Sequence, residues 1–442
     1  MRDESQFIYA AGTTFLTNLS GQAQMDAVNH VYRAKNAVGV LENDLYDSLS
    51  SGNNDWTREC VDDLVNHPDA HLASIIKYNH SAPIHKQMML EEYISISEDM
   101  NAEEVAAEQI TVIPKRGKSG KDVPCQAPGV KRWIAQHNIA RIVKATYNSR
   151  SNQFGNRGVQ YAIAAAQAVV TRGNESVVTL EIDLYGNLDV SALSSLTGID
   201  RKWIEAAFKT RRKGVTIGAT FDSSPPTHLE QFLKELESGL LRDDPGSPVD
   251  TLVNHCLSHL RFADSPRQPL VNYNNRFLIA AANTEDRTDA VQRVRDACAT
   301  LPGGPFEVRE TRCCHAIDGF EFLGHNFTTR NGSLSTVESG DAFEEDSWRF
   351  SVLEEAVRQS LSSRVSDSGH AESPIEKLAT LVAFRKGWAA AYGQCDNVRE
   401  YLNFFDGPID ELCHACGCSI RQVNGHIRPG MGYFPNALIL GD

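Results

Sequence analysis

Cysteine and histidine residues gather near the C-terminal end of the sequence, at spacings that can hold a metal ion. Cys413 and Cys416 have the spacing of a ligand pair, Cys418 follows closely, and His426 lies downstream. Thiolates and imidazoles in such patterns hold structural zinc ions. The sequence provides no second well-spaced pair, however, and a buried cysteine commonly packs as a small apolar side chain. We therefore expect a buried turn of thiols here and retain zinc as the alternative.

Basic residues are concentrated in one segment of an acidic chain. The net charge is −14, and residues 1–110 hold 6 Lys/Arg against 18 Asp/Glu, whereas residues 111–176 hold 11 against 2. Such a basic segment can form a phosphate-binding stripe in an otherwise acidic protein, although it can also be a solvated face without a ligand. The candidate phosphate contacts are Lys115, Arg116, Lys118, Lys121, Lys131, Arg132, Arg141, Lys144, Arg150 and Arg157.

Length and composition are those of a globular protein. The 442 residues suffice for several domains, and the apolar and charged fractions are 41% and 23%. The sequence has no apolar run of the roughly 20 residues that span a bilayer, and Met1–Glu4 lack the layout of a signal peptide. Ten cysteines without a repeating framework are typical of reduced thiols. These observations predict a cytoplasmic protein without a membrane partner.

Apolar periodicity and turn residues predict alternating helices and strands. Helices are expected at 131–143, 160–170, 190–208, 228–241, 248–260 and 288–300. Strands are expected at 109–113, 177–182, 277–281 and 319–324. Residues 1–110 should be helices and loops, with one loop at 48–54. Ser373, Pro374 and Glu376 fit a capping box with proline in the first turn, which predicts a helix from there toward Tyr392. Trp388 and Tyr392, four apart on that helix, should pack in a core.

Five segments, in one order and spacing, resemble the reverse transcriptases of group II introns. Two are similar to the fingers of that family: 113–121, followed by Gln136 and Arg141, and 153–158. Residues 181–189 resemble its palm strand, with Asp183 and Asp189 six apart. Pro245-Gly246-Ser247-Pro248 resembles the block that holds template and nucleotide, and 319–324 the end of the palm. Residues 386–405 are similar to the thumb, so the resemblance covers roughly 111–405.

The most informative departure from this family lies at Tyr273-Asn274-Asn275-Arg276, where the family carries Tyr-x-Asp-Asp on a hairpin. Nucleotidyl transfer uses two Mg²⁺ ions, which require anionic oxygen ligands. Asn275 and Arg276 occupy the two acidic positions, and neither an amide nor a guanidinium replaces a carboxylate as a ligand. Leu188 also stands where the family has an aromatic gate. The resemblance therefore implies a palm that keeps Asp183 as a residual ligand or as a partner of Arg276, without catalysis.

The resemblance implies a fold of α/β (α+β) class, the right-handed polymerase, with an antiparallel palm sheet and a helical thumb. The expected domains are an acidic helical region at 1–110, fingers and palm at 111–345, the thumb at 346–406 and a Cys/His tail at 407–442. The expected partner is RNA, bound at the basic residues and at Gly246 and Ser247. A further expected partner is an active reverse transcriptase subunit or a second copy of the chain. The resemblance also implies a role in a mobile element, as for maturases, or in anti-phage defence.

Two other functions remain open. The chain could be an active RNA-directed DNA polymerase with a non-standard metal site, in which Asp183, Asp189, Asp264 or another chain supplies the missing ligands. It would then need Mg²⁺, whereas a non-catalytic protein needs no cofactor. The chain could also be a protein-interaction module that does not bind nucleic acid. Binding of a divalent metal at Asp183 would favour the active polymerase. Weak RNA binding that does not depend on salt would favour the protein-interaction module.

Overall fold

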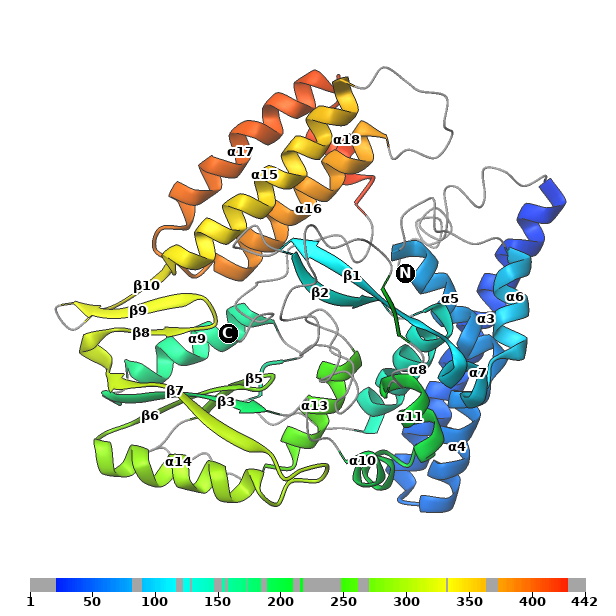
Figure 1. Ribbon diagram of the computed structural model, residues 1–442, viewed down its shortest axis with the longest axis horizontal. Helices are drawn as coiled ribbons and strands as arrows, with labels where there is room; N and C mark the ends of the chain where they lie inside the picture. Colours follow the sequence, from blue (N-terminus) through cyan, green and yellow to red (C-terminus); the bar gives the residue numbers. More distant parts are fainter. Residues whose placement is uncertain are drawn as a thin grey trace.

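Helices and small sheets are combined in one α+β architecture, shown as a computed structural model in Figure 1. This confirms the expected mixture of helices with an antiparallel sheet. The structure describes residues 21–81, 90–116, 122–127, 129–146, 153–155, 158–171, 173–183, 189–209, 215–217, 248–260, 270–330, 333–362 and 373–427. The expected helix at 228–241 lies outside these residues.

The N-terminal part is helical, as the sequence predicts. Its helices are α3 (Gly21–Ser51), α4 (Asn54–Asn66), α5 (Pro68–Ser81), α6 (Leu90–Asp99) and α7 (Ala102–Ala107). The Asn53 side chain accepts hydrogen bonds from two backbone amides of α4, and Asn101 does the same for α7, which satisfies donors that helix formation leaves unpaired. The loop expected at 48–54 is shorter, because α3 continues to Ser51.

A small sheet and three helices follow. The sheet has the order β2 (Asp122–Ala127), β1 (Ile110–Arg116), β4 (Val215–Ile217), and the helices are α8 (Val130–Thr146), α10 (Val190–Thr197) and α11 (Arg201–Phe208). The single helix expected at 190–208 is wrong. Gly198 ends α10 in the left-handed conformation, at φ 74°, and the Asp200 side chain caps α11.

The central sheet is antiparallel and has the order β5-β6-β3-β7. Its strands are β3 (Ser176–Asp183), β5 (Leu270–Tyr273), β6 (Arg276–Ala281) and β7 (Glu307–His315). Helix α9 (Val159–Val170) contacts β5 and β6, whereas α14 (Thr284–Cys298) contacts β6, β3 and β7. The two helices lie on opposite sides of the sheet in Figure 1. Helix α13 (Pro248–Ser258) packs against α8.

A second antiparallel sheet connects the central sheet to a C-terminal helical bundle. After the short helix η3 (Ala316–Asp318), it contains β8 (Phe320–Phe322), β9 (His325–Arg330) and β10 (Ser333–Glu338). The bundle contains α15 (Gly340–Ser362), α16 (Pro374–Tyr392), α17 (Val398–Ala415) and α18 (Ile420–Asn424). Ser373 and Glu376 form the expected capping box. The domain limits expected after 345 and 406 fall inside α15 and α17.

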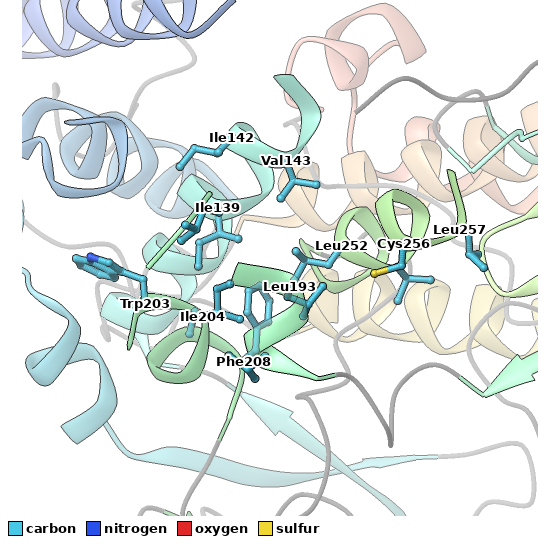
Figure 2. Close-up of a cluster of buried hydrophobic side chains, with 14 of the residues drawn as sticks. Ile139, Ile142, Val143, Leu193, Trp203, Ile204, Phe208, Leu252, Cys256 and Leu257 are labelled. Carbon is cyan, nitrogen blue, oxygen red and sulfur yellow. The ribbon is translucent and has the colours of Figure 1, made fainter. Parts of the chain in front are cut away.

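Two hydrophobic cores lie on the two faces of the central sheet. Val178, Leu180 and Ile182 of β3 belong to the first core, together with the N-terminal helices and α14, whereas Val177 belongs to the second, with α9 and the C-terminal bundle. Trp388 and Tyr392 are buried in the second core, as expected. Figure 2 shows part of the first core, where side chains of α8, α10, α11 and α13 meet.

Two carboxyl groups are buried where β10 meets the bundle. Glu338, the last residue of β10, is 3% exposed, and Asp346 of α15 is 1% exposed. The indole Nε1 of Trp388 donates a hydrogen bond of 3.1 Å to Oε1 of Glu338. Burial, and then the neighbouring Asp346, raise the pKa of Glu338 to about 9, so this carboxyl group is protonated at neutral pH.

Candidate functional site

The segment Tyr273-Asn274-Asn275-Arg276 forms the hairpin that its resemblance implies. Tyr273 ends β5, Arg276 begins β6, and these two residues are paired across the turn. Asn274 has a φ of 48°, which asparagine tolerates better than most residues. Strand β6 also pairs with β3, where Arg276 lies opposite Glu181. The turn therefore lies beside the end of β3, at which Asp183 is the last residue.

Asn275 connects this turn to β3 through both its backbone and its side chain. Ile182 N donates to Asn275 O at 2.9 Å, and Asn275 Nδ2 donates to Ile182 O at 3.2 Å. Nδ2 also lies 3.4 Å from Oε1 of Glu181. Both side-chain contacts use the amide as a donor, which a carboxylate is not at neutral pH. Asn275 therefore fits this position through donor chemistry that an aspartate, the residue expected here from the resemblance, lacks.

A network of buried amides holds the hairpin from its other side. Asn254 Nδ2 of α13 donates to Asn274 Oδ1 at 2.9 Å, and Asn272 Nδ2 donates to the backbone oxygen of Asn274 at 2.6 Å. Gln153 Nε2 donates to the backbone oxygen of Asn254 at 2.8 Å. All four residues are 9% exposed or less. Buried amides that bond to one another in this way fix the geometry of the segments that carry them.

Gly155 is the position where a third segment approaches this network. A Cβ atom at Gly155 would overlap the side-chain amides of Asn254 and Asn274. Phe154 N donates to Asn272 O at 2.8 Å, and Gln153 pairs with Asn272 in an isolated parallel bridge. The resemblance assigns residues 153–158 to a separate segment of the fingers. It carries no local signal that Gln153, Asn254 and Asn272 meet, because they lie far apart along the chain.

The amides around the hairpin supply neutral donors and acceptors, which suit hydrogen bonding better than Mg²⁺ coordination. The side chain of Asp183 lies outside the described part of the structure. Asp189, the second acid of the expected pair, accepts a hydrogen bond from Ser191 N at 2.8 Å and caps α10. Within the described ranges, no group of three or more His, Cys, Asp or Glu side chains could hold a metal ion.

Arg132 has a structural role in place of the expected phosphate contact. Its side chain is buried, and Nη1 donates to Ala206 O at 2.6 Å and to Lys209 O at 2.7 Å. Nη2 lies 3.3 Å from Glu108 O. The guanidinium thereby satisfies carbonyl groups at the C-terminal ends of α7 and α11. Gln136, one helical turn later, is also buried and donates to Ala207 O at 2.9 Å.

The other basic candidates have different environments. Lys131 and Arg141 are both half-buried. Lys131 forms an ion pair of 2.7 Å with Glu104, and Arg141 forms one of 3.0 Å with Glu42. Lys144 is exposed in the last turn of α8. Lys115 and Arg116 lie on β1, with undescribed side chains. The remaining candidates lie outside the described residues and are Lys118, Lys121, Arg150, Arg157, Gly246 and Ser247.

The cysteine cluster lies at the end of α17. Cys413 is buried, and Cys416 and Cys418 are half-buried. Burial is the main cause that raises the pKa of Cys413 to about 11, and it also raises the pKa of Cys416. His426 follows α18, where its backbone N donates to Val423 O. Cys413 therefore packs as a small apolar side chain of the second core, which is the environment expected for a buried turn of thiols.

Comparisons with known proteins found neither a protein-family model nor a curated protein that matches this sequence. The reverse transcriptase resemblance therefore depends on the residues themselves and on their arrangement. Among the described helices, none is both long and apolar enough to cross a membrane.

Proposed function

We propose that this chain is a reverse-transcriptase-like protein that binds RNA without catalysing nucleotidyl transfer. The observation that carries the proposal is the position of Asn275 and Arg276, on a hairpin beside the end of β3. The related polymerases carry their acids on this hairpin, next to the strand that ends in the first aspartate. The arrangement of β5, β6 and β3 in one antiparallel sheet supports a palm in which the acids have been replaced.

The contacts of Asn275 support the loss of catalysis. Two-metal catalysis needs carboxylates that share the ions. In this chain, the amide of Asn275 donates toward Ile182 O and Glu181 Oε1, and thus stabilises the hairpin without any cation. A guanidinium at position 276 adds fixed positive charge, which opposes binding of Mg²⁺. The same charge favours a phosphate group.

The basic segment supports RNA as the partner. Neutralising phosphates with lysine and arginine releases counterions, so binding weakens as salt rises. Arg132 does not contribute to such a surface, because it is buried. Lys144 is exposed and is the described side chain of this segment that is best placed to contact a polyanion.

The first test is primer extension on RNA and DNA templates, with Mg²⁺ and with Mn²⁺, for the native protein and for Asp183→Ala. We expect no incorporation by either protein. Incorporation that disappears in Asp183→Ala would refute the loss of catalysis and would favour a metal site built from other carboxylates.

The second test is RNA binding measured by fluorescence anisotropy over a range of salt concentrations. We expect affinity to fall as salt rises, and Lys144→Glu to weaken binding. Lys202→Glu is the matched control, because Lys202 is exposed on α11, outside the basic segment. Weak binding that does not depend on salt would contradict RNA as the partner and favour a protein-interaction module.

A further inference from the structure

Helix α17 ends in a motif that brings two cysteines together. Cys418 N donates to Cys413 O at 3.0 Å, and Gly417 N donates to His414 O at 3.0 Å. Gly417 has a φ of 62°, in the left-handed region. This pair of hydrogen bonds around a left-handed glycine is the Schellman motif, which reverses the chain at the end of a helix. The backbone bond between residues 413 and 418 holds their α-carbons close to each other.

The Schellman motif usually brings an apolar pair into contact at the two positions that Cys413 and Cys418 occupy. In this chain both positions are cysteines, and the neighbouring Cys418 contributes, after burial, to the raised pKa of Cys413. Cys418 likewise contributes to the raised pKa of Cys416, so it lies near both thiols. All three cysteines are free thiols in this structure.

We propose that Cys413 and Cys418 are a reversible dithiol–disulfide site that reacts by exchange with a small-molecule disulfide such as oxidised glutathione. The thiolate of Cys418, which is half-buried, attacks one sulfur of the reagent and releases the first small thiol. Cys413 then loses its thiol proton to the departing small thiolate as it attacks the sulfur of Cys418, and the second small thiol is released. Two protein thiols and one small disulfide thus become one protein disulfide and two small thiols.

The geometry favours Cys413 over Cys416 as the partner of Cys418. A disulfide needs α-carbons within about 4.4–6.8 Å, and the 413–418 backbone hydrogen bond keeps them close without any movement of the chain. Cys416 and Cys418 are separated by one residue, and among the described contacts no backbone hydrogen bond joins them. A bond between them would close a much smaller ring, across the left-handed Gly417.

A disulfide at this site would fix the junction between α17 and α18. Ser419 follows Cys418 directly and caps α18, in a capping box with Gln422. The covalent bond would therefore join the end of one helix to the cap of the next, beside the second core to which Cys413 belongs. Oxidation should stabilise the C-terminal bundle without changing the central sheet.

The chain offers an internal control in Cys313 and Cys314, which are adjacent on β7. Successive side chains on a strand point to opposite faces, so these two thiols do not face each other. Cys313 is exposed, and it should form a mixed disulfide with the reagent without a partner to displace it.

The experiment treats the full chain with oxidised glutathione and maps the products by trypsin digestion and mass spectrometry. The segment between Arg399 and Arg421 contains no other lysine or arginine and carries all three cysteines. We expect this peptide to lose two hydrogens and two alkylatable thiols, and to regain both after reduction. The peptide with Cys313 should instead gain glutathione.

Three serine variants identify the pair. Cys413→Ser and Cys418→Ser should abolish the internal disulfide, with a glutathione adduct remaining at Cys418 in the first. Cys416→Ser should leave the disulfide intact. Circular dichroism checks that each variant is folded, and Cys413→Ala and Cys418→Ala repeat the test if a serine variant is not. A disulfide that survives Cys413→Ser but not Cys416→Ser would overturn the proposal, as would a native protein that carries only glutathione adducts.

Discussion

Replacing Glu338 with glutamine should make the protein more stable at alkaline pH. Burial raises the pKa of Glu338 from its ordinary 4.5 to about 9. The folded state therefore holds a proton that the unfolded chain releases once the pH exceeds 4.5. The stabilisation from this group is complete below pH 4.5 and is lost progressively as pH rises to 9. Glutamine keeps an acceptor for Trp388 Nε1 and removes the titration.

The size of the effect follows from the width of this pH window. Each pH unit between the two pKa values costs the native protein up to about 1.4 kcal/mol of unfolding free energy. From pH 5 to pH 8, the loss is thus at most about 4 kcal/mol, and relaxation of the surroundings of Glu338 will lower it. Glu338→Gln should remove most of this slope, whereas the slope contributed by other groups stays.

Urea unfolding, followed by tryptophan fluorescence at several pH values between about 5 and 8, measures the slope directly. Glu321→Gln is the control, because Glu321 is exposed on β8, in the same sheet. Asp346→Asn should also flatten the profile, since Asp346 contributes to the raised pKa of Glu338. Identical slopes for the native protein and Glu338→Gln would refute the protonated carboxyl group.

Three further substitutions test the site and its support. Arg132→Met should lower the free energy of unfolding by about 3 kcal/mol or more, because it leaves buried carbonyl groups of two helix ends unpaired; thermal unfolding measures this, and an unchanged midpoint would contradict the structural role. Asn275→Asp should lower the free energy of unfolding by about 1–3 kcal/mol near neutral pH, because an ionised carboxylate cannot donate to Ile182 O, and by less in acid, where the new carboxyl group is protonated. Urea unfolding at several pH values measures this, and a cost that is the same at every pH would contradict the donor role of the amide. Gly155→Ala should cost about 1–3 kcal/mol through overlap with Asn254 and Asn274. Urea unfolding measures this cost, with Gly340→Ala as the control, because a Cβ atom at Gly340 meets nothing within 4 Å; equal stability of the two variants would contradict the close approach at Gly155.

Local signals in the sequence predicted individual elements well. The capping box at Ser373 and Glu376 correctly predicted where α16 begins, because all its participants lie within one turn. The strands expected at 177–182 and 277–281 correspond to β3 and β6, since short β-branched and apolar runs are typical of buried strands. The break at Gly198 was missed because apolar periodicity continues across it.

Contacts between distant residues were not predictable in the same way. The amide network joins Gln153, Asn254 and Asn272, and nothing in their immediate surroundings distinguishes them from surface polar residues. The burial of Arg132 was equally unpredictable from its neighbours in the sequence. Its position in a basic segment suggested an exposed phosphate contact, whereas the neighbouring helix ends bury it and use its donors. Charge along the sequence does not reveal which side chains a fold encloses.

The shared use of β3 by both cores makes this strand sensitive to changes in chain length. Val178, Leu180 and Ile182 face one core, and Val177 faces the other. Deleting a single residue near the start of β3 would turn every later side chain to the opposite face, so that Glu181 would point into the first core. A substitution in β3 disturbs one core at one place, but a one-residue deletion there would damage both cores together.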